Sequence, residues 1–504
     1  MKDETIGIQG LAFNEPLLFE QGSKGRTACS LPESDVPEVK AERLLPKKLL
    51  RHDVPGFPEL SEIEVVRHFT RMSQWNYGVD LGFYPLGSCT MKYSPKINED
   101  VWRLPGFSRA HPYQPESLAQ GALELMFDLE QYLAEVSGMD RVSLQPAAGA
   151  HGELLGMMLV RAYLESKGNP RKRVLVPDSA HGTNPASSAI CGYQVIQIKS
   201  GPKGCVEPQT VAEAMDENVA AIMVTNPNTL GLFEEHIAEI AKIVHGKGGQ
   251  VYCDGANLNA IMGISRPGDM GIDVLQFNLH KTFSVPHGGG GPGAGPVGLK
   301  AQLAPFMPVP VVEKKGERFS LNYNLPSSVG KVRAFYGNFA ALVRAYAYIR
   351  SLGPSGLRRV AEVAVINANY LMKQLKGHYH LPYDKFCKHE CVFSDARQIP
   401  HDVHTLDIAK RLMDYGFHPP TIYFPLIVRG ALMIEPTETE SKETLDQFID
   451  AMKKIAEEAE REPELVRSAP HKTKISRLDE VKAARQPNLR WKAGASDPGL
   501  SSSG

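Results

Sequence analysis

The sequence lacks the features that mark membrane, secreted or nucleic-acid-binding proteins. No apolar run approaches the roughly 18–20 residues of a membrane-spanning helix, and the N-terminal MKDETIGIQG has neither the basic start nor the apolar core of a signal peptide. The 504 residues carry a formal net charge of −1, so no charge excess indicates nucleic acid or a membrane surface as a partner. The seven cysteines are scattered and odd in number, which favours a reduced setting. We therefore expect a soluble cytoplasmic enzyme of two or three domains.

Composition and periodicity divide the chain into an arm, two folded domains, a helical connection and a tail. Residues 1–60 are rich in proline, glycine and charge, and their weak periodicity predicts an extended arm that packs on a partner subunit. Residues 61–325 are expected to form a large domain, and residues 377–467 a small C-terminal domain. Residues 326–376 predict a long helical connection, and residues 468–504, basic and then rich in glycine and serine, predict a disordered tail.

In the large domain, helical and strand patterns alternate in the way that is typical of a parallel sheet covered by helices. Ser61 is expected to cap a helix that runs to Trp75. A second amphipathic helix is predicted from Leu118 to Val136, ended by Gly138, and a third from Gly152 to Leu164. We predict an α/β fold with a doubly wound, mostly parallel sheet. The short apolar strands are expected at Arg141–Leu144, Arg173–Val176, Tyr193–Ile198, Ala220–Thr225, Gln250–Cys253 and Val274–Asn278.

Beyond the sheet, the pattern predicts an irregular stretch, the helical connection and an α+β small domain. Leu303–Asn324 is rich in proline and is expected to be irregular. The helical connection should be interrupted at Gly353-Pro354 and ended by Gly377. The elements predicted for the small domain are strands Cys391–Ser394 and Ala431–Ile434, and helices Thr405–Asp414 and Ser441–Glu457.

The stretch from Asp273 to Leu299 carries the strongest chemical signal. Its apolar strand ends at His280-Lys281-Thr282, and a glycine-rich loop follows. A lysine at the end of a strand, beside backbone that a ligand can approach closely, suits a lysine that must form an imine. A surface lysine beside a flexible turn is the simpler alternative. However, the strand Gln250–Cys253 ends in Asp254, and pyridoxal phosphate (PLP) chemistry needs both a Schiff-base lysine and an acid for the pyridinium nitrogen.

Other polar clusters also follow predicted strands, where ligands of such sheets collect. The segment from Gln145 to Gly152 opens a helix with small residues, so its backbone N–H groups could reach a phosphate. His181 could stack on a flat heteroaromatic ring or be a structural histidine. The segment Tyr84–Lys92 is either an ordinary loop or a lip that offers donors to a small anionic substrate. Cys387-Lys-His389-Glu-Cys391 has a spacing like that of a metal site but lacks a second ligand pair, so no metal site is predicted.

Five long motifs, in order, identify a family resemblance. Residues from about 55 to 460 resemble the C-terminal half of glycine decarboxylase, the P-protein of the glycine cleavage system, and more narrowly its separate subunit 2 where the P-protein is split into two chains. The matching motifs are Pro85-Leu-Gly-Ser-Cys-Thr-Met-Lys92, Asp254-Gly-Ala-Asn257, Asn278-Leu-His-Lys-Thr-Phe283 with Pro286-His-Gly-Gly-Gly-Gly-Pro-Gly293, Gly330-Lys-Val-Arg-Ala-Phe-Tyr-Gly-Asn-Phe339 and Leu432-Met-Ile-Glu-Pro-Thr-Glu438.

The resemblance implies a fold-type I PLP enzyme with an active site at a subunit interface. Lys281 would hold PLP covalently, and Asp254 would pair with its ring nitrogen. His181 would stack on one face of the ring and Ala256 would lie against the other. The phosphate would rest on the backbone of Gly149 and Ala150 with help from the His280 region, and the substrate would meet Ser88, Cys89 and Thr90.

The resemblance also implies an activity and partners. The enzyme would release CO2 from glycine and transfer the aminomethyl group to the lipoyl arm of H-protein, in an α2β2 assembly with a P-protein subunit 1 of similar fold. Two alternatives remain open. One is another fold-type I enzyme, such as an amino-acid decarboxylase or a cysteine desulfurase, which would need a mobile reactive cysteine. The other is a non-catalytic scaffold subunit, against which the pairing of Lys281 with Asp254 argues.

Overall fold

The computed structural model describes residues 15–51, 56–288, 293–473 and 475–490. The chain divides into two units, Val79–Lys472 and Met1–Gly78 with Thr473–Gly504. Part of the glycine-rich loop, residues 289–292, and the end of the expected tail, residues 491–504, lie outside the described residues. Within the described ranges, no helix combines the length and apolarity needed to cross a membrane.

The smaller unit contains helix α2, Glu62–Ser73, which begins where the sequence predicts a helix start. The Ser61 backbone N–H donates to the Glu64 carboxylate at 2.7 Å, which stabilises the first turn. His68 and Arg71 bind the buried carboxylate of Glu15. The other described helices of this unit are short: η1 Leu18–Glu20, α1 Ala41–Leu44, η2 Lys47–Leu49 and α14 Glu480–Arg485. Helix α14 lies in the segment for which the sequence predicts disorder.

A seven-stranded sheet forms the centre of the larger unit, with strand order β1-β7-β6-β5-β4-β2-β3. All six predicted strands are present, and the sheet is parallel except at β7, which runs antiparallel to β1 and β6. The strands are β1 Arg141–Ser143, β2 Arg173–Pro177, β3 Gln194–Ile198, β4 Val219–Thr225, β5 Gln250–Gly255, β6 Val274–Phe277 and β7 Val297–Leu299. Strand β7 was not predicted, because three residues with a central glycine carry no recognisable strand pattern.

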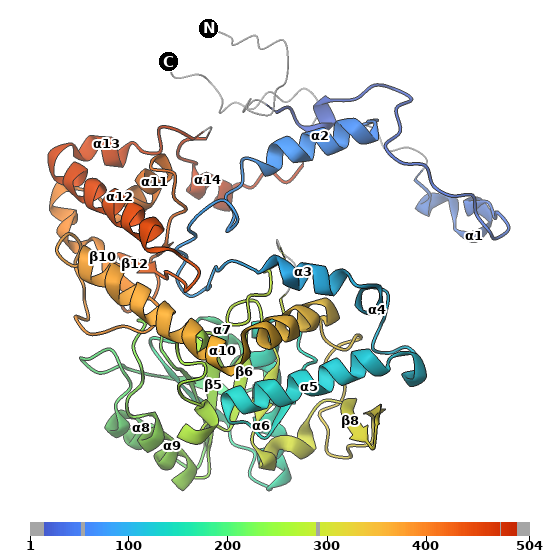
Figure 1. Ribbon diagram of the computed structural model, residues 1–504, viewed down its shortest axis with the longest axis horizontal. Coiled ribbons are helices and arrows are strands. Elements are labelled where there is room, and N and C mark those ends of the chain that lie inside the picture. The colour runs from blue at the N-terminus through green and yellow to red at the C-terminus, as the bar shows by residue number, and fades with distance from the viewer. Residues whose placement is uncertain (1–14, 52–55, 289–292, 474, 491–504) are drawn as a thin grey trace. The chain divides into compact units, whose positions relative to one another are not determined.

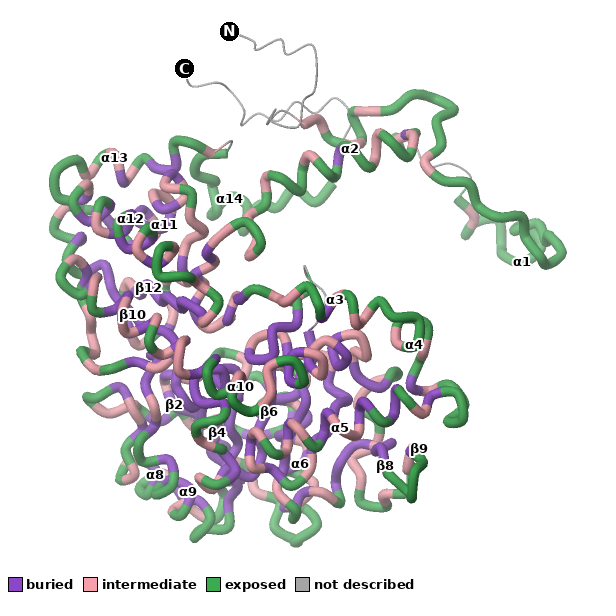
Figure 2. Tube along the Cα trace, viewed as in Figure 1, coloured by how far each residue is buried: buried purple, intermediate pink, exposed green. Residues whose placement is uncertain are grey.

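Helices cover both faces of this sheet (Figure 1). Cys253 and Leu275 pack in a cluster with α5, α9 and α10, whereas Tyr252 and Val274 pack in a second cluster with α6. Figure 2 shows β2, β4 and β6 buried, as the unbroken apolar strands predict. The helices are α3 Lys96–Arg103, α4 Pro105–Ser108, α5 Gln120–Ser137, α6 Gly149–Ser166, α7 Thr183–Ile190, α8 Pro208–Ala214, α9 Ile237–Gly246 and α10 Phe339–Leu375. The α/β prediction is confirmed.

Two stretches differ from the sequence prediction. The region expected to be irregular contains the short helix η6, Ala301–Phe306, and a hairpin of β8, Val311–Lys315, and β9, Arg318–Asn322. The helical connection begins at Phe339 rather than near Pro326, because Gly330 and Gly337 have φ angles of 86° and 63°, outside the right-handed helical region. The expected interruption is present, since Gly353 is non-helical at φ 61°.

The C-terminal part of the larger unit is a three-stranded antiparallel sheet with helices packed against it. Both predicted strands and both predicted helices are present, and the short strand β11 was not predicted. The loop Pro85–Lys92 reaches this sheet, where Leu86 forms an antiparallel bridge with Ile434. The elements are β10 Cys391–Ser394, α11 Thr405–Asp414, β11 Thr421–Ile422, β12 Ala431–Ile434, α12 Lys442–Arg461 and α13 Pro463–Arg467.

Candidate active site

Lys281 lies in the turn that follows β6, and its side chain is held by a distant loop. The Lys281 backbone N–H donates to the Asn278 carbonyl at 3.0 Å, which forms the turn. The Lys281 Nζ donates to the Ser88 carbonyl oxygen at 2.8 Å. Two segments 193 residues apart in sequence therefore meet at this amine.

Asp254 lies near the carboxyl end of β5, between two parallel neighbours. In the sheet register it pairs with Thr225 of β4 and Gln276 of β6. Only 4% of the residue is exposed, and its Oδ1 accepts a hydrogen bond from the Ala256 backbone N–H at 3.0 Å. The parallel register thus brings Asp254 to the same edge of the sheet as Lys281, where ligands of such folds bind.

The start of α6 forms another wall of the site. Ala148 is extended and Gly149 begins the helix, so the first N–H groups have no partner within the helix and attract an anion. Close packing here requires glycine, since a Cβ on Gly149 would lie 2.5 Å from the Asn278 Oδ1. His280 lies nearby, and burial together with the charges of His287 and Lys281 lowers its pKa to about 3, so its ring is neutral.

These groups line a cavity of about 230 Å³. It gathers all seven residues expected at the cofactor and one of the three expected at the substrate. Of that last group, Ser88 lines the cavity, whereas Cys89 and Thr90 lie in the same loop but not on this wall. The expected residues on the wall are Ser88, Gly149, Ala150, His181, Asp254, Ala256, His280 and Lys281.

Glu153 also lines the cavity and was missed by the sequence reasoning. Its Oε1 accepts a hydrogen bond from the Thr183 hydroxyl at 2.8 Å, and that hydroxyl lies 2.9 Å from the His181 Nδ1. Burial, and secondly the negative charge of Asp254, raises the pKa of Glu153 to about 8. The available signal was a single carboxylate in the first turns of an otherwise apolar helix.

The chemistry of the cavity wall suits PLP. Polar atoms at its wall, the Thr225 Oγ1, the Asn257 Oδ1 and the His280 Nδ1, are buried without a hydrogen-bond partner among the described residues. Buried polar groups of this kind are normally satisfied, which indicates a polar ligand. A larger cavity of about 930 Å³ lies between α5 and the kink of α10, but its described wall contains no lysine. The smaller cavity, which contains Lys281 and Asp254, is therefore the candidate active site.

Comparisons with known proteins identify the family of the chain. Residues 31–317 match the family "Glycine cleavage system P-protein", and residues 360–474 match "Glycine dehydrogenase, C-terminal domain". A protein of Caldanaerobacter subterraneus subsp. tengcongensis named "Probable glycine dehydrogenase (decarboxylating) subunit 2" is 60% identical over 476 residues, covering 94% of this chain and 98% of its own length.

Solved structures show the same fold at lower identity. A crystal structure of glycine decarboxylase (P-protein) of the glycine cleavage system, in inhibitor-bound form, superimposes with a TM-score of 0.70 at 21% identity, over 82% of this chain and 95% of that one. A cysteine desulfurase from Thermococcus onnurineus has a TM-score of 0.59 at 16% identity, over 75% and 95%.

The sheet order and the solved structures define the fold, and the P-protein family match places the chain in the class of the fold-type I PLP-dependent enzymes. Within this class the two family matches and the 60% identity are specific. The chain belongs to the glycine cleavage system P-protein family, and within it to the subunit 2 chains of glycine dehydrogenase (decarboxylating).

Proposed function

We propose that this chain is the PLP-dependent subunit of a glycine dehydrogenase (aminomethyl-transferring, decarboxylating), an oxidoreductase that acts on a CH–NH2 group with a disulfide acceptor. It releases CO2 from glycine and passes the aminomethyl group to the lipoyl arm of H-protein. The observation that carries the proposal is the convergence of Lys281 and Asp254 at one wall of a small polar cavity. Bound PLP supplies the electron sink for the pair that CO2 leaves on the glycine Cα.

The cavity residues that the sequence indicated each receive a role in this proposal. Lys281 carries the cofactor, and the Asp254 carboxylate keeps a proton on the ring nitrogen. The first N–H groups of α6 at Gly149 and Ala150 hold the phosphate, and the neutral His280 lies beside them. His181, fixed by Thr183 and Glu153, covers one ring face, and Ala256 lies against the other.

The substrate requires little of the site. Glycine has no side chain, so the protein must bind a carboxylate and exclude bulk. Ser88, Cys89 and Thr90 are proposed to form the substrate lip, of which Ser88 reaches the cavity wall. A cysteine desulfurase is disfavoured because burial raises the pKa of the Cys89 thiol, which opposes formation of a nucleophilic thiolate.

Borohydride reduction of the full chain incubated with PLP, followed by peptide mass mapping, tests the role of Lys281. A pyridoxyl group on Lys281 is expected, because borohydride reduces the imine to a secondary amine that does not hydrolyse. Labelling that appears only after subunit 1 is added would mean that the partner completes the site. No label under either condition would contradict the proposal and leave the scaffold alternative.

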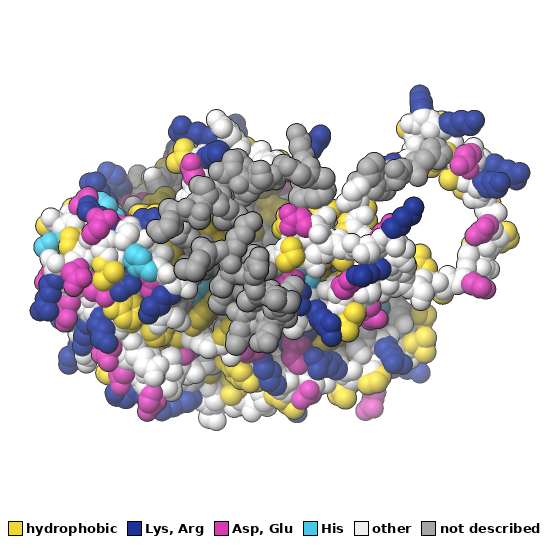
Figure 3. Space-filling model, turned by 90° about the horizontal axis from the view of Figure 1, so that it is seen from above, with side chains coloured by type: hydrophobic (Ala, Val, Ile, Leu, Met, Phe, Trp, Pro, Cys, Tyr) yellow, Lys and Arg dark blue, Asp and Glu magenta, His cyan; other side chains and the backbone are white. Residues whose placement is uncertain are grey.

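We further propose that the chain works in the cytoplasm as half of an α2β2 assembly with a P-protein subunit 1. The free thiols of all seven cysteines fit a reduced compartment. On the face shown in Figure 3, acidic and basic side chains are interspersed, which suits protein and small-molecule partners better than a polyanion. Helix α2 supports the subunit contact, because Ile63, Val66 and Phe69 recur along it at three-residue spacing and are 53%, 56% and 55% exposed.

Replacing these three apolar residues should weaken the assembly. We expect the triple variant I63S/V66S/F69S to shift the mixture with subunit 1 toward free chains in sedimentation velocity, because an interface loses its apolar contacts. Arg67→Ser, on the same helix and also exposed, is the matched control and should assemble normally. Unchanged assembly of the triple variant would exclude α2 from the interface.

A further inference from the structure

The loop Pro85–Lys92 holds an uncommon backbone conformation. Ser88 and Thr90 have φ angles of 64° and 42°, in the left-handed region that residues with a Cβ rarely adopt. Such residues persist where their surroundings enforce the conformation, often at functional sites. The Ser88 carbonyl, which accepts the hydrogen bond from Lys281, lies inside this turn. The position of the Lys281 amine is therefore linked to the shape of the loop.

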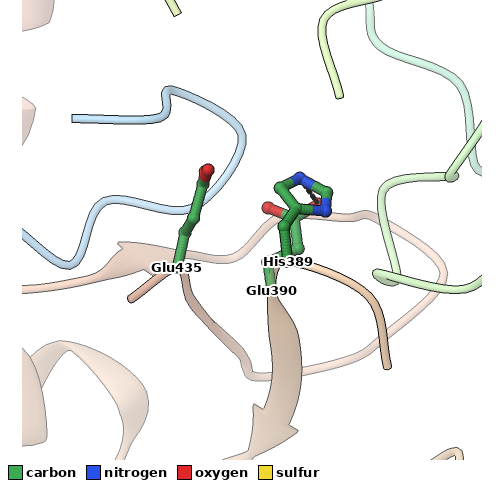
Figure 4. A group of neighbouring side chains, drawn as sticks. All are labelled: His389, Glu390 and Glu435. Carbon is green, nitrogen blue, oxygen red and sulfur yellow. Dashed lines mark ion pairs between the residues drawn. The ribbon is translucent and has the colours of Figure 1, made fainter. Parts of the chain in front are cut away.

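A buried carboxylate holds the backbone N–H of each left-handed residue. The Ser88 N–H donates to the Glu390 Oε2 at 2.8 Å, and the Thr90 N–H donates to the Glu435 Oε2 at 3.0 Å. Glu390 directly precedes β10 and Glu435 directly follows β12, and these strands pair with Cys391 opposite Ile434. The register of the small sheet thus presents both carboxylates together (Figure 4). Hydrogen bonds from N–H groups to carboxylates are stronger than those to neutral acceptors.

A third carboxylate holds the end of the loop. The fully buried Lys92 Nζ donates to the Glu438 Oε1 at 2.8 Å and to the Thr282 carbonyl at 2.8 Å. Thr282 directly follows Lys281, so the two segments are joined reciprocally: Lys281 binds the carbonyl of Ser88, and Lys92 binds the carbonyl of Thr282. When the Lys281 amine binds a group other than the Ser88 carbonyl, the hydrogen bond from Lys92 to the Thr282 carbonyl still joins the loop to the turn that contains Lys281.

Glu390 and Glu435 also form a close buried group with His389. Their ligand-type atoms lie within 4.8 Å of one another, and all three residues are buried. The Glu390 Oε1, the Glu435 Oε1 and both ring nitrogens of His389 have no hydrogen-bond partner among the described residues. Burial raises the pKa of Glu435 to about 7, and burial with the charge of Glu435 raises that of Glu390. Two buried carboxylates this close oppose each other's ionisation.

We propose that Glu390, Glu435 and Glu438, here called the acid clamp, are positioning residues that hold the loop Pro85–Lys92 so that the Ser88 carbonyl receives the Lys281 amine. One oxygen of each carboxyl group accepts from the loop, and mutual repulsion of the two buried groups limits the negative charge beside Lys281. The functional meaning rests on the proposed role of Lys281, but the clamp itself can be tested on the cofactor-free full chain.

Two double variants distinguish the effect of losing the hydrogen-bond acceptors from the effect of changing the side-chain volume. In the variant E390M/E435M the volume remains and the acceptors are lost, whereas E390Q/E435Q keeps an uncharged acceptor at both positions. Hydrogen exchange of the 85–92 peptide should be about tenfold faster or more in the Met variant and close to wild type in the Gln variant. Modification of Lys281 by an amine-reactive reagent, quantified by mass spectrometry, should likewise be faster in the Met variant and close to wild type in the Gln variant. If the double Met variant does not fold, E390M and E435M are measured singly.

Glu440→Ala is the matched control, because Glu440 lies in the segment after β12 but its side chain makes no hydrogen bond to the loop among the described residues. It should leave both readouts unchanged. Unchanged exchange and labelling in the Met variants, or a Gln variant that behaves like the Met variant, would overturn the clamp. Stoichiometric uptake of Zn²⁺ or Mn²⁺ by the wild-type chain that is lost in His389→Ala would also overturn it, by making the group a metal site. Because neither readout needs PLP, failure of the clamp and failure of the proposed function are distinguishable.

Discussion

Lys281→Ala is expected to lower kcat for glycine decarboxylation at least about 10⁴-fold, because the chain then has no amine to carry the cofactor. The assay follows CO2 release from carboxyl-labelled glycine, with PLP, H-protein and subunit 1 present. Lys281→Arg should be equally inactive, since a guanidinium keeps the charge and can still donate to the Ser88 carbonyl but cannot form the imine.

Lys247→Ala is the control for this experiment. Lys247 is an exposed lysine after α9 and lies outside the cavity wall, so kcat should be unchanged. Circular dichroism should show the same fold in all three variants. The assignment of Lys281 would be wrong if the alanine variant kept wild-type turnover, or if borohydride placed the pyridoxyl group on Lys92, the buried lysine of the neighbouring loop.

Asp254→Asn should lower kcat by about 10²–10⁴-fold, the range found for groups that control a proton in the transition state. The amide keeps the volume and can still accept from the Ala256 N–H, but it cannot hold a proton on the ring nitrogen by charge. The variant should still carry PLP on Lys281, as shown by borohydride labelling. Retained labelling with low kcat would separate activation of the cofactor from its attachment.

Asp273→Asn provides the matched comparison in the same sheet. Asp273 is equally buried, lies just before β6, and binds His245 at 2.7 Å and the Val251 N–H at 2.7 Å. Its loss should lower Tm and leave kcat near wild type, because it does not line the cavity. If both variants lowered kcat in proportion to their loss of stability, Asp254 would have no special role.

Local patterns predicted most of the large domain. The six parallel-type strands and the helices α5 and α6 were predicted to within a few residues, because unbroken apolar runs and helical spacing are local consequences of burial on one or both faces. Strand β7 and the β8–β9 hairpin were missed. Strand β7 is specified by pairing with β1 and β6, and it contains a glycine that a local pattern cannot assign to a strand. The β8–β9 hairpin pairs locally, and it was missed because its proline-rich surroundings predict irregular structure.

The candidate site was predictable where a charged side chain follows an apolar strand. Lys281 and Asp254 each follow an apolar strand, and the small residues from Gly149 to Gly152 open a helix. Glu153 was missed because a carboxylate in a helix is normally exposed, and only its burial beside Asp254 distinguishes it. Cys387-Lys-His389-Glu-Cys391 attracted attention for its cysteines, although the side chains that meet the active-site loop belong to Glu390 and to Glu435, 45 residues later.

The sequence by itself determined the α/β class and the family, and it indicated Lys281 and Asp254 as the residues proposed to act on PLP. Apolar periodicity and family motifs lie in consecutive residues, so they can be recognised without the structure. Only the tertiary structure decided how the site is assembled. The parallel register sets Asp254 between Thr225 and Gln276, and the antiparallel register of β10 and β12 sets two buried carboxylates under the Ser88–Thr90 turn. The hydrogen bonds that hold this turn join residues 302, 345 and 193 positions apart. They arise from backbone pairing and packing that no local pattern encodes.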